Sequence, residues 1–429
     1  MVVHEDVTAR DSHPRAGSPG ARKLLAAARD LTEKGGWPTC TLDAVTKAVG
    51  RDKTAIRYYF GDREGLVQAL VTSVLEQAAA DDDRRLAQLE RAEDRIAARL
   101  EQHRKWVSSR QATLFLELIP VMLRDERLRP LLAEWLARQS ERESEALAPQ
   151  ASGDARRRAD TVGGLVQAGV IGLSLRSRVV ADPAIEPVLG LWQTVIRRFL
   201  TPSETEDASE APAGSQSPSA VTPEQRPGGI ELPLPAVPDP LRELPASAQR
   251  LVRVTQDLVK QRGWSTLTVS AVTSGAGLEK PAVSYYFGDK AGLVTAAVES
   301  VFHDENADEV RHLARLGDTH DVLDVHLAHL RANAASDMVV SYVELITNLM
   351  RERSGRAKLA EWITLYGRMN AYALSLECGR LIDPSDPLVL LTGDVDDGLA
   401  VRCASGSDGE VAEAYSLLAR VLRRELLRA

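Results

Sequence analysis

Ten residues that read GWPTCTLDAV at positions 36–45 return as GWSTLTVSAV at positions 263–272. A second run, YYFGD, stands at 58–62 and again at 285–289. Both repeats have an offset of 227 residues, and about half of the positions between 21 and 74 are identical to their counterparts without a gap. A chance match does not hold one register over such a length, so the sequence indicates an internal duplication.

The duplication extends beyond this window. At the same offset, ELI at 117–119 matches ELI at 344–346, and AEW at 133–135 matches AEW at 360–362. Within each copy the apolar residues recur at helical spacing, and no alternating strand pattern of convincing length is present. This spacing is clearest at 86–106, 114–123, 131–147 and 188–200. The sequence therefore predicts an all-α fold made of two tandem units, each of roughly 180 residues.

The segment that joins the copies has a different composition. It is rich in Pro, Ser, Glu, Gly and Ala and lacks any regular period, which predicts a linker partly extended by its prolines. The first residues of the chain read as a disordered tail for the same reason. The expected organisation is a tail at 1–20, a head at 21–75, a helical body at 76–200, the linker at 201–246, a second head at 247–302 and a second body at 303–429.

Composition and charge limit the classes of protein to which this chain can belong. Apolar residues make up 44% of the 429 positions and charged residues 27%, as in soluble globular proteins. No stretch approaches the ~18 consecutive apolar residues of a membrane helix, and no secretory signal is recognisable. The three cysteines are scattered, so no disulfide framework is expected and the predicted compartment is the cytoplasm. The net charge of −8 argues against general nucleic-acid binding, although 1–75 and 243–301 each carry a small basic excess.

Near its start, each copy has a pair of short helices around a glycine turn. Thr41 is suited to cap the first helix, Gly50 supplies the turn, and the second helix is expected at 53–60. The second copy repeats the pattern at Thr268, Gly277 and 280–287. Two short helices joined in this way form a helix-turn-helix, whose second helix enters the major groove of DNA.

The stretch from Thr41 through YYFGDREGL, and its counterpart from Thr268 to Leu293, resemble the DNA-binding region of the TetR family. The resemblance is strong over 21–75 and 248–302, whereas in the bodies it rests on length and helical pattern alone. It implies a DNA-binding head of three N-terminal helices in each copy. It also implies bodies that dimerise through their last two long helices and, as is usual in the family, enclose a small-molecule pocket. The last of these helices are expected at 188–200 and about 410–427.

Several residues of the heads have the chemistry of DNA contacts. Thr41 and Thr268 stand at helix starts, where a hydroxyl and free amides can bind a phosphate. Arg63 and Lys290 stand where the resemblance implies a phosphate contact at the start of a fourth helix. The expected DNA-binding set is Thr41, Arg51, Lys53, Thr54, Arg57, Tyr58, Arg63, Thr268, Lys280, Pro281, Ser284, Tyr285 and Lys290.

The aromatic residues beside this set have a packing explanation. Tyr59 and Tyr286 are as readily explained by core packing as by DNA contact, because neighbouring side chains on a helix point in different directions. Phe60 and Phe287 are expected in the core, where large aromatic side chains contribute most.

The two predicted reading helices differ. Where the resemblance implies a tyrosine, one copy has Arg57 and the other has Ser284. Arginine can contact guanine with two hydrogen bonds, whereas serine can make one undiscriminating bond. The copies also differ at Thr54 against Pro281 and at Arg51 against Leu278. The heads therefore need not read the same bases, and we expect an imperfect palindrome as the operator.

Other motifs do not point to chemistry. His326 and His329 stand one helical turn apart, but no further ligand spacing completes a metal site, and no metal or other cofactor is expected. Four glycines, at 163, 164, 169 and 172, lack the strand and lysine of a phosphate loop and are expected to pack helices closely between the copies. No nucleophile–base arrangement is visible, so an enzyme is not expected.

These observations predict a sequence-specific DNA-binding transcriptional repressor that responds to a small molecule and binds double-stranded DNA as a single-chain pseudo-dimer. Within this class, two chains could instead pair and present four heads. An alternative from another class is a small-molecule-binding scaffold or enzyme whose heads no longer bind DNA. The caps, turn glycines and basic residues retained in both copies favour DNA binding.

Overall fold

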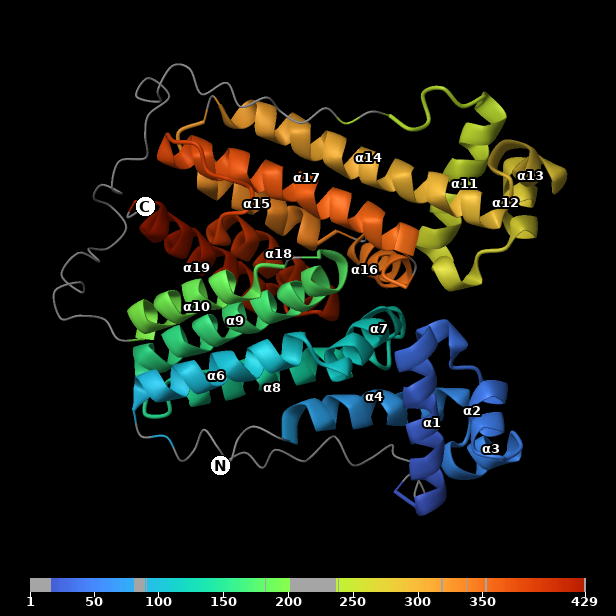
Figure 1. The fold of residues 1–429 in the computed structure, drawn as a ribbon, viewed down its shortest axis with the longest axis horizontal. Coiled ribbons are helices and arrows are strands. Elements are labelled where there is room, and N and C mark those ends of the chain that lie inside the picture. The colour runs from blue at the N-terminus through green and yellow to red at the C-terminus, as the bar shows by residue number, and fades with distance from the viewer. Residues whose placement is uncertain are drawn as a thin grey trace.

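The computed structural model describes residues 17–80, 91–181, 183–200 and 239–427, except positions 318, 337 and 352, together with the single positions 89 and 237. Every regular element in this part of the chain is a helix, which confirms the predicted all-α fold. The two copies lie side by side, with both heads at the same end of the molecule (Figure 1).

The two copies have matching orders of helices. The first copy contains α1 (Pro19–Gly35), the short 3-10 helix η2 (Trp37–Thr39), α2 (Leu42–Ala48), α3 (Thr54–Phe60), α4 (Arg63–Ala80), α6 (Ala92–Val107), α7 (Arg110–Arg124), α8 (Arg129–Leu147), α9 (Gly153–Val179) and α10 (Ile185–Leu200). The second contains α11 (Ala246–Arg262), the 3-10 helix η4 (Trp264–Thr266), α12 (Val269–Ala276), α13 (Pro281–Phe287), α14 (Lys290–Leu316), α15 (Val322–Ala334), α16 (Met338–Leu349), α17 (Arg353–Cys378), α18 (Pro387–Ser405) and α19 (Asp408–Leu426).

The boundary between head and body falls inside a helix in each copy. Helices α4 and α14 continue past the expected boundaries at 75 and 302, so each head is joined to its body by unbroken helix. Helix α1 begins at Pro19, within the predicted tail, because the Ser18 side chain caps it by accepting a hydrogen bond from the Ala21 amide. The rest of that tail and most of the predicted linker lie outside the described residues.

The bodies pack on each other around a pseudo-twofold axis, with α9 of the first against α18 of the second (Figure 1). Gly172 lies against the backbone of Asp394, and Gly398 lies against the backbone of Ala168, with no room for a Cβ atom at either glycine. These contacts are reciprocal because GLSLR at 172–176 corresponds to GLAVR at 398–402, where the offset has shifted to 226. Equivalent patches that meet in this way form an isologous interface, as in a twofold dimer.

Two of the four glycines expected between the copies have a different role. Gly172 and Gly164 face α18, but Gly163 packs against α8 and Gly169 against α10, which both belong to the same body. Helices within a body approach as closely as helices of different bodies. A glycine in the sequence therefore does not by itself indicate which of these two contacts it makes.

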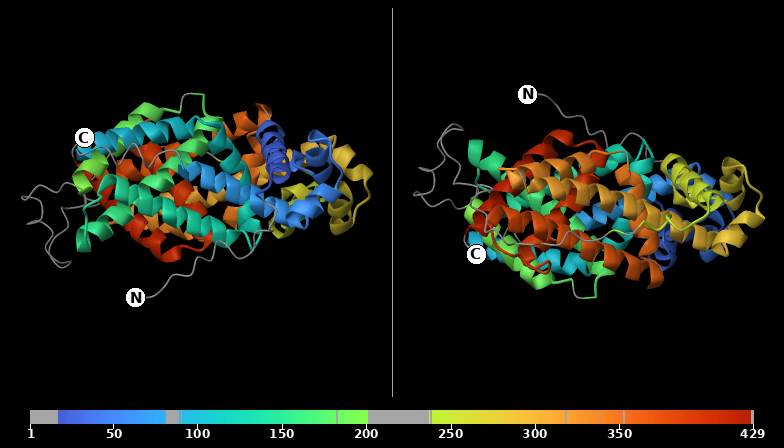
Figure 2. Two further views of the ribbon diagram at one scale, coloured as in Figure 1. Left: turned by 90° about the horizontal axis from the view of Figure 1, so that it is seen from below. Right: turned by 90° about the horizontal axis from the view of Figure 1, so that it is seen from above.

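The bodies share a hydrophobic core. Trp192 of α10 is fully buried in it with Leu165 of α9, Leu391 of α18 and Leu418 of α19. Two views turned by 90° from that of Figure 1 show the green and red helices of the two bodies packed together, with the heads at one end of the molecule (Figure 2). Because side chains of both copies bury one another, each body stabilises its counterpart.

Candidate nucleic-acid interface

The first head presents a short helix after a glycine turn. Thr41 caps α2, and its hydroxyl oxygen accepts a hydrogen bond from the Ala44 amide at 3.2 Å. Gly50 then adopts a φ of 66°, which is costly for a residue with a Cβ atom. The Arg51 amide donates to the Thr46 carbonyl oxygen at 2.9 Å, and the chain turns into α3. This is the helix-turn-helix expected from the sequence.

The second head repeats this geometry. Thr268 caps α12 through the Ala271 amide at 3.1 Å, and Gly277 has the same φ of 66° as its counterpart. Pro281 occupies the first turn of α13, where its missing N–H removes no helical hydrogen bond. The two reading helices, α3 and α13, therefore begin in different ways on the same backbone framework.

In the first head, acidic side chains hold the start of the reading helix. The Thr54 amide and hydroxyl both donate to the Asp52 carboxylate, the amide at 2.9 Å. These bonds, the hydroxyl's above all, lower the pKa of Asp52. Lys53 forms an ion pair with Asp43 at 2.8 Å, and both side chains are largely exposed. An exposed pair of this kind is weak, so Lys53 can exchange its carboxylate partner for a phosphate.

Each reading helix buries one face and exposes another. Ile56 and Phe60 of α3 are 2% and 4% exposed, and Val283 of α13 is 1% exposed. On the opposite face, Tyr58 and Tyr285 are 52% and 81% exposed. Both rings are therefore accessible at the surface of the heads.

The other tyrosine of each pair packs inside the head. The Tyr59 ring lies against Gly20 of α1, and Tyr286 packs on the core of the second head. This agrees with the packing explanation of both residues. Phe60 is buried as expected, whereas Phe287 is partly buried at the edge of its smaller core.

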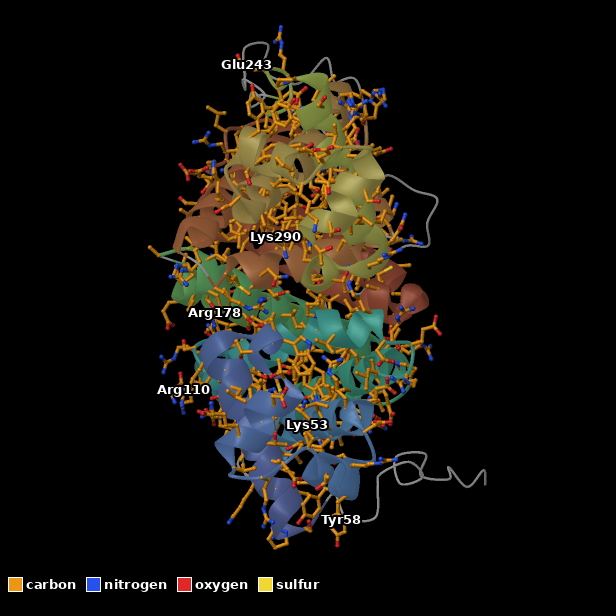
Figure 3. The ribbon with its side chains drawn as sticks, turned by 90° about the vertical axis from the view of Figure 1, so that its right-hand side faces the viewer. Lys53, Tyr58, Arg110, Arg178, Glu243 and Lys290 are labelled. Carbon is orange, nitrogen blue, oxygen red and sulfur yellow. The ribbon has the colours of Figure 1, made fainter. Side chains whose placement is uncertain are left out.

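Every residue of the predicted DNA-binding set is exposed. The set comes from α2, α3 and α4 with the turn between them, and from the corresponding part of the second copy. Figure 3 looks onto the end of the molecule that carries both heads, with Lys53 and Tyr58 on the first head and Lys290 on the second. The set is therefore accessible to a DNA duplex laid across this end.

The two basic residues that open the fourth helices have different surroundings. The Arg63 guanidinium lies over the Trp37 ring, 6.0 Å from its centroid. The Lys290 ammonium donates to the Leu267 carbonyl oxygen at 2.5 Å. A guanidinium has five N–H groups and an ammonium three, so both keep donors for a phosphate.

A buried glutamate ties the first head to both bodies. Glu117 of α7 accepts a hydrogen bond from the Trp37 amide at 3.1 Å, directly after α1. The same carboxylate accepts from Arg351 Nε of the second copy at 3.1 Å. Glu117 is only 6% exposed, so this contact is largely shielded from water.

The second copy contains the reciprocal junction. Glu344 of α16 accepts from the Trp264 amide at 2.9 Å and from Arg124 Nε of the first copy at 2.7 Å. The sequence did not predict these roles. The available signal was the ELI match at 117–119 and 344–346, together with arginines at 124 and 351 at the same offset of 227. The contacts of Glu117 and Glu344 thus form two junctions, each of which joins the end of a head's first helix to the interface between the bodies.

The capped helices, glycine turns and exposed reading helices define a protein of the helix-turn-helix class with two heads. The model of the family "Bacterial regulatory proteins, tetR family" matches residues 24–70 and 251–297, which lie in these two heads. Both heads are therefore TetR-family domains, and the chain is a tandem TetR-like fusion, as the repeat predicted.

A curated relative agrees with this assignment. The chain is similar to the HTH-type transcriptional regulator BetI of Stenotrophomonas maltophilia (strain R551-3), with 32% identity over 74 residues. The match covers 17% of this chain and 38% of that protein, so the chain spans well under half of the relative's length. A match of this length supports the assignment to a helix-turn-helix regulator over part of the chain.

Membrane spans and metal sites concern two further features of the sequence. Across the described residues, no helix combines the length and apolarity that a membrane span needs. His326 Nε2 lies 3.0 Å from Asn370 Oδ1, and His329 Nε2 lies 2.8 Å from the Glu309 carboxylate. Among the residues that the structure describes, no three His, Cys, Asp or Glu side chains are grouped as metal ligands.

Proposed function

We propose that this chain is a sequence-specific DNA-binding transcriptional repressor that acts as a single-chain pseudo-dimer and responds to a small molecule. The observation that carries the proposal is the placement of two exposed reading helices at one end of the molecule, held by an isologous interface within the chain. A helix-turn-helix dimer needs two reading helices about one DNA turn, roughly 34–36 Å, apart. One chain supplies both.

Selection of bound duplexes from a random pool by the purified protein tests this function. We expect an imperfect palindrome, because Arg57 of α3 and Ser284 of α13 offer different hydrogen bonds to base edges. The half-site bound by α3 should require guanine more strongly. Failure to enrich any sequence would contradict the proposed function, and a fully symmetric consensus would mean that the differing residues do not touch bases.

Base contacts and phosphate contacts should separate by mutation. Arg57→Ala is expected to cost about 1–3 kcal/mol of binding and to relax base preference within one half-site. Arg63→Ala should instead weaken binding to all sequences and flatten its dependence on salt, because one phosphate contact is lost. Lys290→Ala should do the same in the second head. Titrations of the selected duplex and of an unrelated duplex at several salt concentrations measure both effects, and unchanged affinity in all three variants would reject the assignment of the heads.

The solution state should be one chain. Tethering two halves raises the effective concentration of one for the other to around millimolar, so pairing within a chain should prevail over exchange between chains. Light scattering is expected to report 46.7 kDa, and one chain should bind each operator. A stable particle of two chains at low micromolar concentration would favour the four-headed arrangement.

A further inference from the structure

The pseudo-twofold arrangement of the bodies is broken at a pair of arginines. Arg176 of α9 and Arg402 of α18 occupy equivalent positions of the two copies. Arg176 reaches across the interface to Asp394 of α18 through two hydrogen bonds, at 2.7 and 2.8 Å. The position equivalent to Asp394 in the first copy is Ala168, which has no carboxylate to offer to Arg402. The two arginines therefore have different partners.

Arg402 is nevertheless buried, with only 3% of its side chain exposed. One guanidinium nitrogen donates to the Ser140 hydroxyl of α8 at 2.5 Å, and another to the Glu410 carboxylate of α19 at 2.5 Å. The Glu410 side chain is 62% exposed, so most of it lies in water. Burial lowers the pKa of Arg402, and Glu410 offsets this only in part. Because a guanidinium stays protonated in proteins, Arg402 is a buried cation with incomplete compensation.

A pocket opens in front of this guanidinium. Its volume is about 360 Å³, within the range of ~300–1,000 Å³ that is typical of ligand pockets. Its walls come from α8 and α9 of the first body and from α18 and α19 of the second. Of the described residues, none from α6 or α7 lines it, so the pocket lies on the seam between the bodies and outside the interior of the first.

The space on this side of the pseudo-twofold axis reflects two small residues of α9. A Cβ atom on Gly164 would lie 3.9 Å from Arg402 Cζ, with nothing closer, whereas the equivalent residue of the second body is Leu390. One helical turn later, Ala168 stands where the second body has Asp394. The first body thus supplies neither the side chain that would fill the space nor the charge that would neutralise the arginine.

The chemistry of the anchor indicates the class of ligand. A guanidinium is planar, and its N–H groups match the two oxygens of a carboxylate, as the Arg176–Asp394 pair shows in this protein. Ala137, Gly164 and Ala414 also line the pocket and suit an uncharged remainder of the ligand. A carboxylate with an uncharged body therefore fits this site.

The other charges of the pocket limit the ligand to one negative charge. Arg156 pairs with Asp160 at 2.8 Å. Arg157 pairs with Asp154. Both of these arginines are thus already neutralised, and the exposed acids that line the pocket would repel a second anionic group. These acids are Glu141, Asp160, Glu410 and Glu413.

We propose that the seam pocket binds a small organic monocarboxylate, one per chain, with its carboxylate on Arg402 as the Asp394 carboxylate is on Arg176. Glu410 gives up its hydrogen bond from Arg402 and turns into solvent when the ligand enters. The binding does not rest on the regulatory function proposed above. Because Arg402 belongs to the second body and Gly164 to the first, the bound ligand joins the two bodies.

The first experiment measures binding to the full chain without DNA. Acetate, benzoate and 3-phenylpropanoate are titrated at constant ionic strength, each beside its neutral amide, while melting temperature and heat of binding are followed. At least one carboxylate should raise the melting temperature saturably and bind with a stoichiometry of one, and no amide should. An equal response to the amide or to sulfate, or no response to any of the three carboxylates, would overturn the proposal.

Two variants locate the site. Arg402→Met removes the anchor and should weaken binding about a hundredfold or more, because two hydrogen bonds to a charged group are lost. Ala168→Asp restores the carboxylate that the pseudo-twofold axis predicts beside Arg402, and this internal carboxylate should abolish binding by occupying the guanidinium. If one variant does not fold, the other still decides. Binding that survives in either folded variant would place the ligand elsewhere and reject the site.

A third variant tests the displacement of Glu410. Glu410→Ala removes the internal competitor and should tighten carboxylate binding by about twofold to fivefold, as expected for loss of a largely exposed ion pair. Glu413→Ala removes the same charge from the same pocket and should change the affinity less. Weaker binding by Glu410→Ala, or equal gains in both variants, would contradict an exchange of carboxylates at Arg402.

Discussion

Arg176→Ala is expected to lower the free energy of unfolding by about 3–5 kcal/mol, because it leaves a buried carboxylate without its partner. Arg176 of α9 and Asp394 of α18 are 6% and 2% exposed, and their two hydrogen bonds join the bodies at the centre of the molecule. Urea unfolding followed by circular dichroism measures the loss. Replacing both partners, Arg176→Met with Asp394→Leu, should recover most of it, since no charge is then left unpaired.

The second body provides a matched control. Arg402 occupies the position equivalent to Arg176, but Ala168 stands where its carboxylate partner would be. Arg402 instead pairs with Glu410, whose side chain is 62% exposed and stays solvated when the guanidinium is removed. Arg402→Ala should therefore cost about 2 kcal/mol less than Arg176→Ala. Equal losses would mean that lost volume, and not an unpaired charge, sets the cost.

The loss of unfolding free energy caused by Arg176→Ala should become smaller on acidification. Burial raises the pKa of Asp394 even with Arg176 present, and removal of the guanidinium raises it further. When a carboxyl pKa is higher in the folded state, the stabilisation due to protonation is present below the unfolded pKa and is lost as pH rises through the folded pKa. The difference in unfolding free energy between the wild type and Arg176→Ala should therefore decrease as the pH is lowered from about 8 to 5. The double variant with Asp394→Asn should not show it.

The heads were predictable because their signals are local. A threonine cap, a glycine turn and a buried i, i+4 pair such as Ile56 and Phe60 each act within a few residues, and the repeat showed every one of them twice. The duplication also indicated that two equivalent bodies exist. It did not indicate which faces meet, because the contact residues of α9 and α18 read as ordinary helix-packing positions.

The burial of the three aspartates of α18 was not predictable for a different reason. The sequence GDVDDGL at 393–399 places three aspartates within four residues, a pattern that normally indicates a solvated helix face. In the structure α9 covers one side of this helix and α17 the other, so the carboxylates face protein. Likewise Glu117 reads as an isolated acid within an apolar run, and its partner Arg351 is contributed by the other copy.

Replacing both junction glutamates, Glu117→Ala with Glu344→Ala, is expected to weaken operator binding about a hundredfold. Each glutamate accepts one hydrogen bond from a head amide and pairs with an arginine of the other copy. Charge-assisted bonds of this kind contribute about 1.5–3 kcal/mol each, and a tenfold change in affinity corresponds to 1.4 kcal/mol. If each junction contributes about 1.4 kcal/mol to holding its head in place, loss of either raises Kd about tenfold. Loss of both then raises it about a hundredfold.

The dependence on salt distinguishes positioning from contact. The glutamates touch no DNA in this assignment, so the slope of binding affinity against salt should stay that of the wild type, whereas Arg63→Ala should lower it. Glu126→Ala removes an exposed carboxylate from the cleft between the first head and the bodies, which Glu117 and Glu344 also line, and should change neither quantity. If the double variant bound the operator as the wild type does, the unbroken helices α4 and α14 alone would suffice to position the heads. A lowered slope would instead mean that the junctions hold phosphate-binding residues directly, because the slope counts the phosphates neutralised.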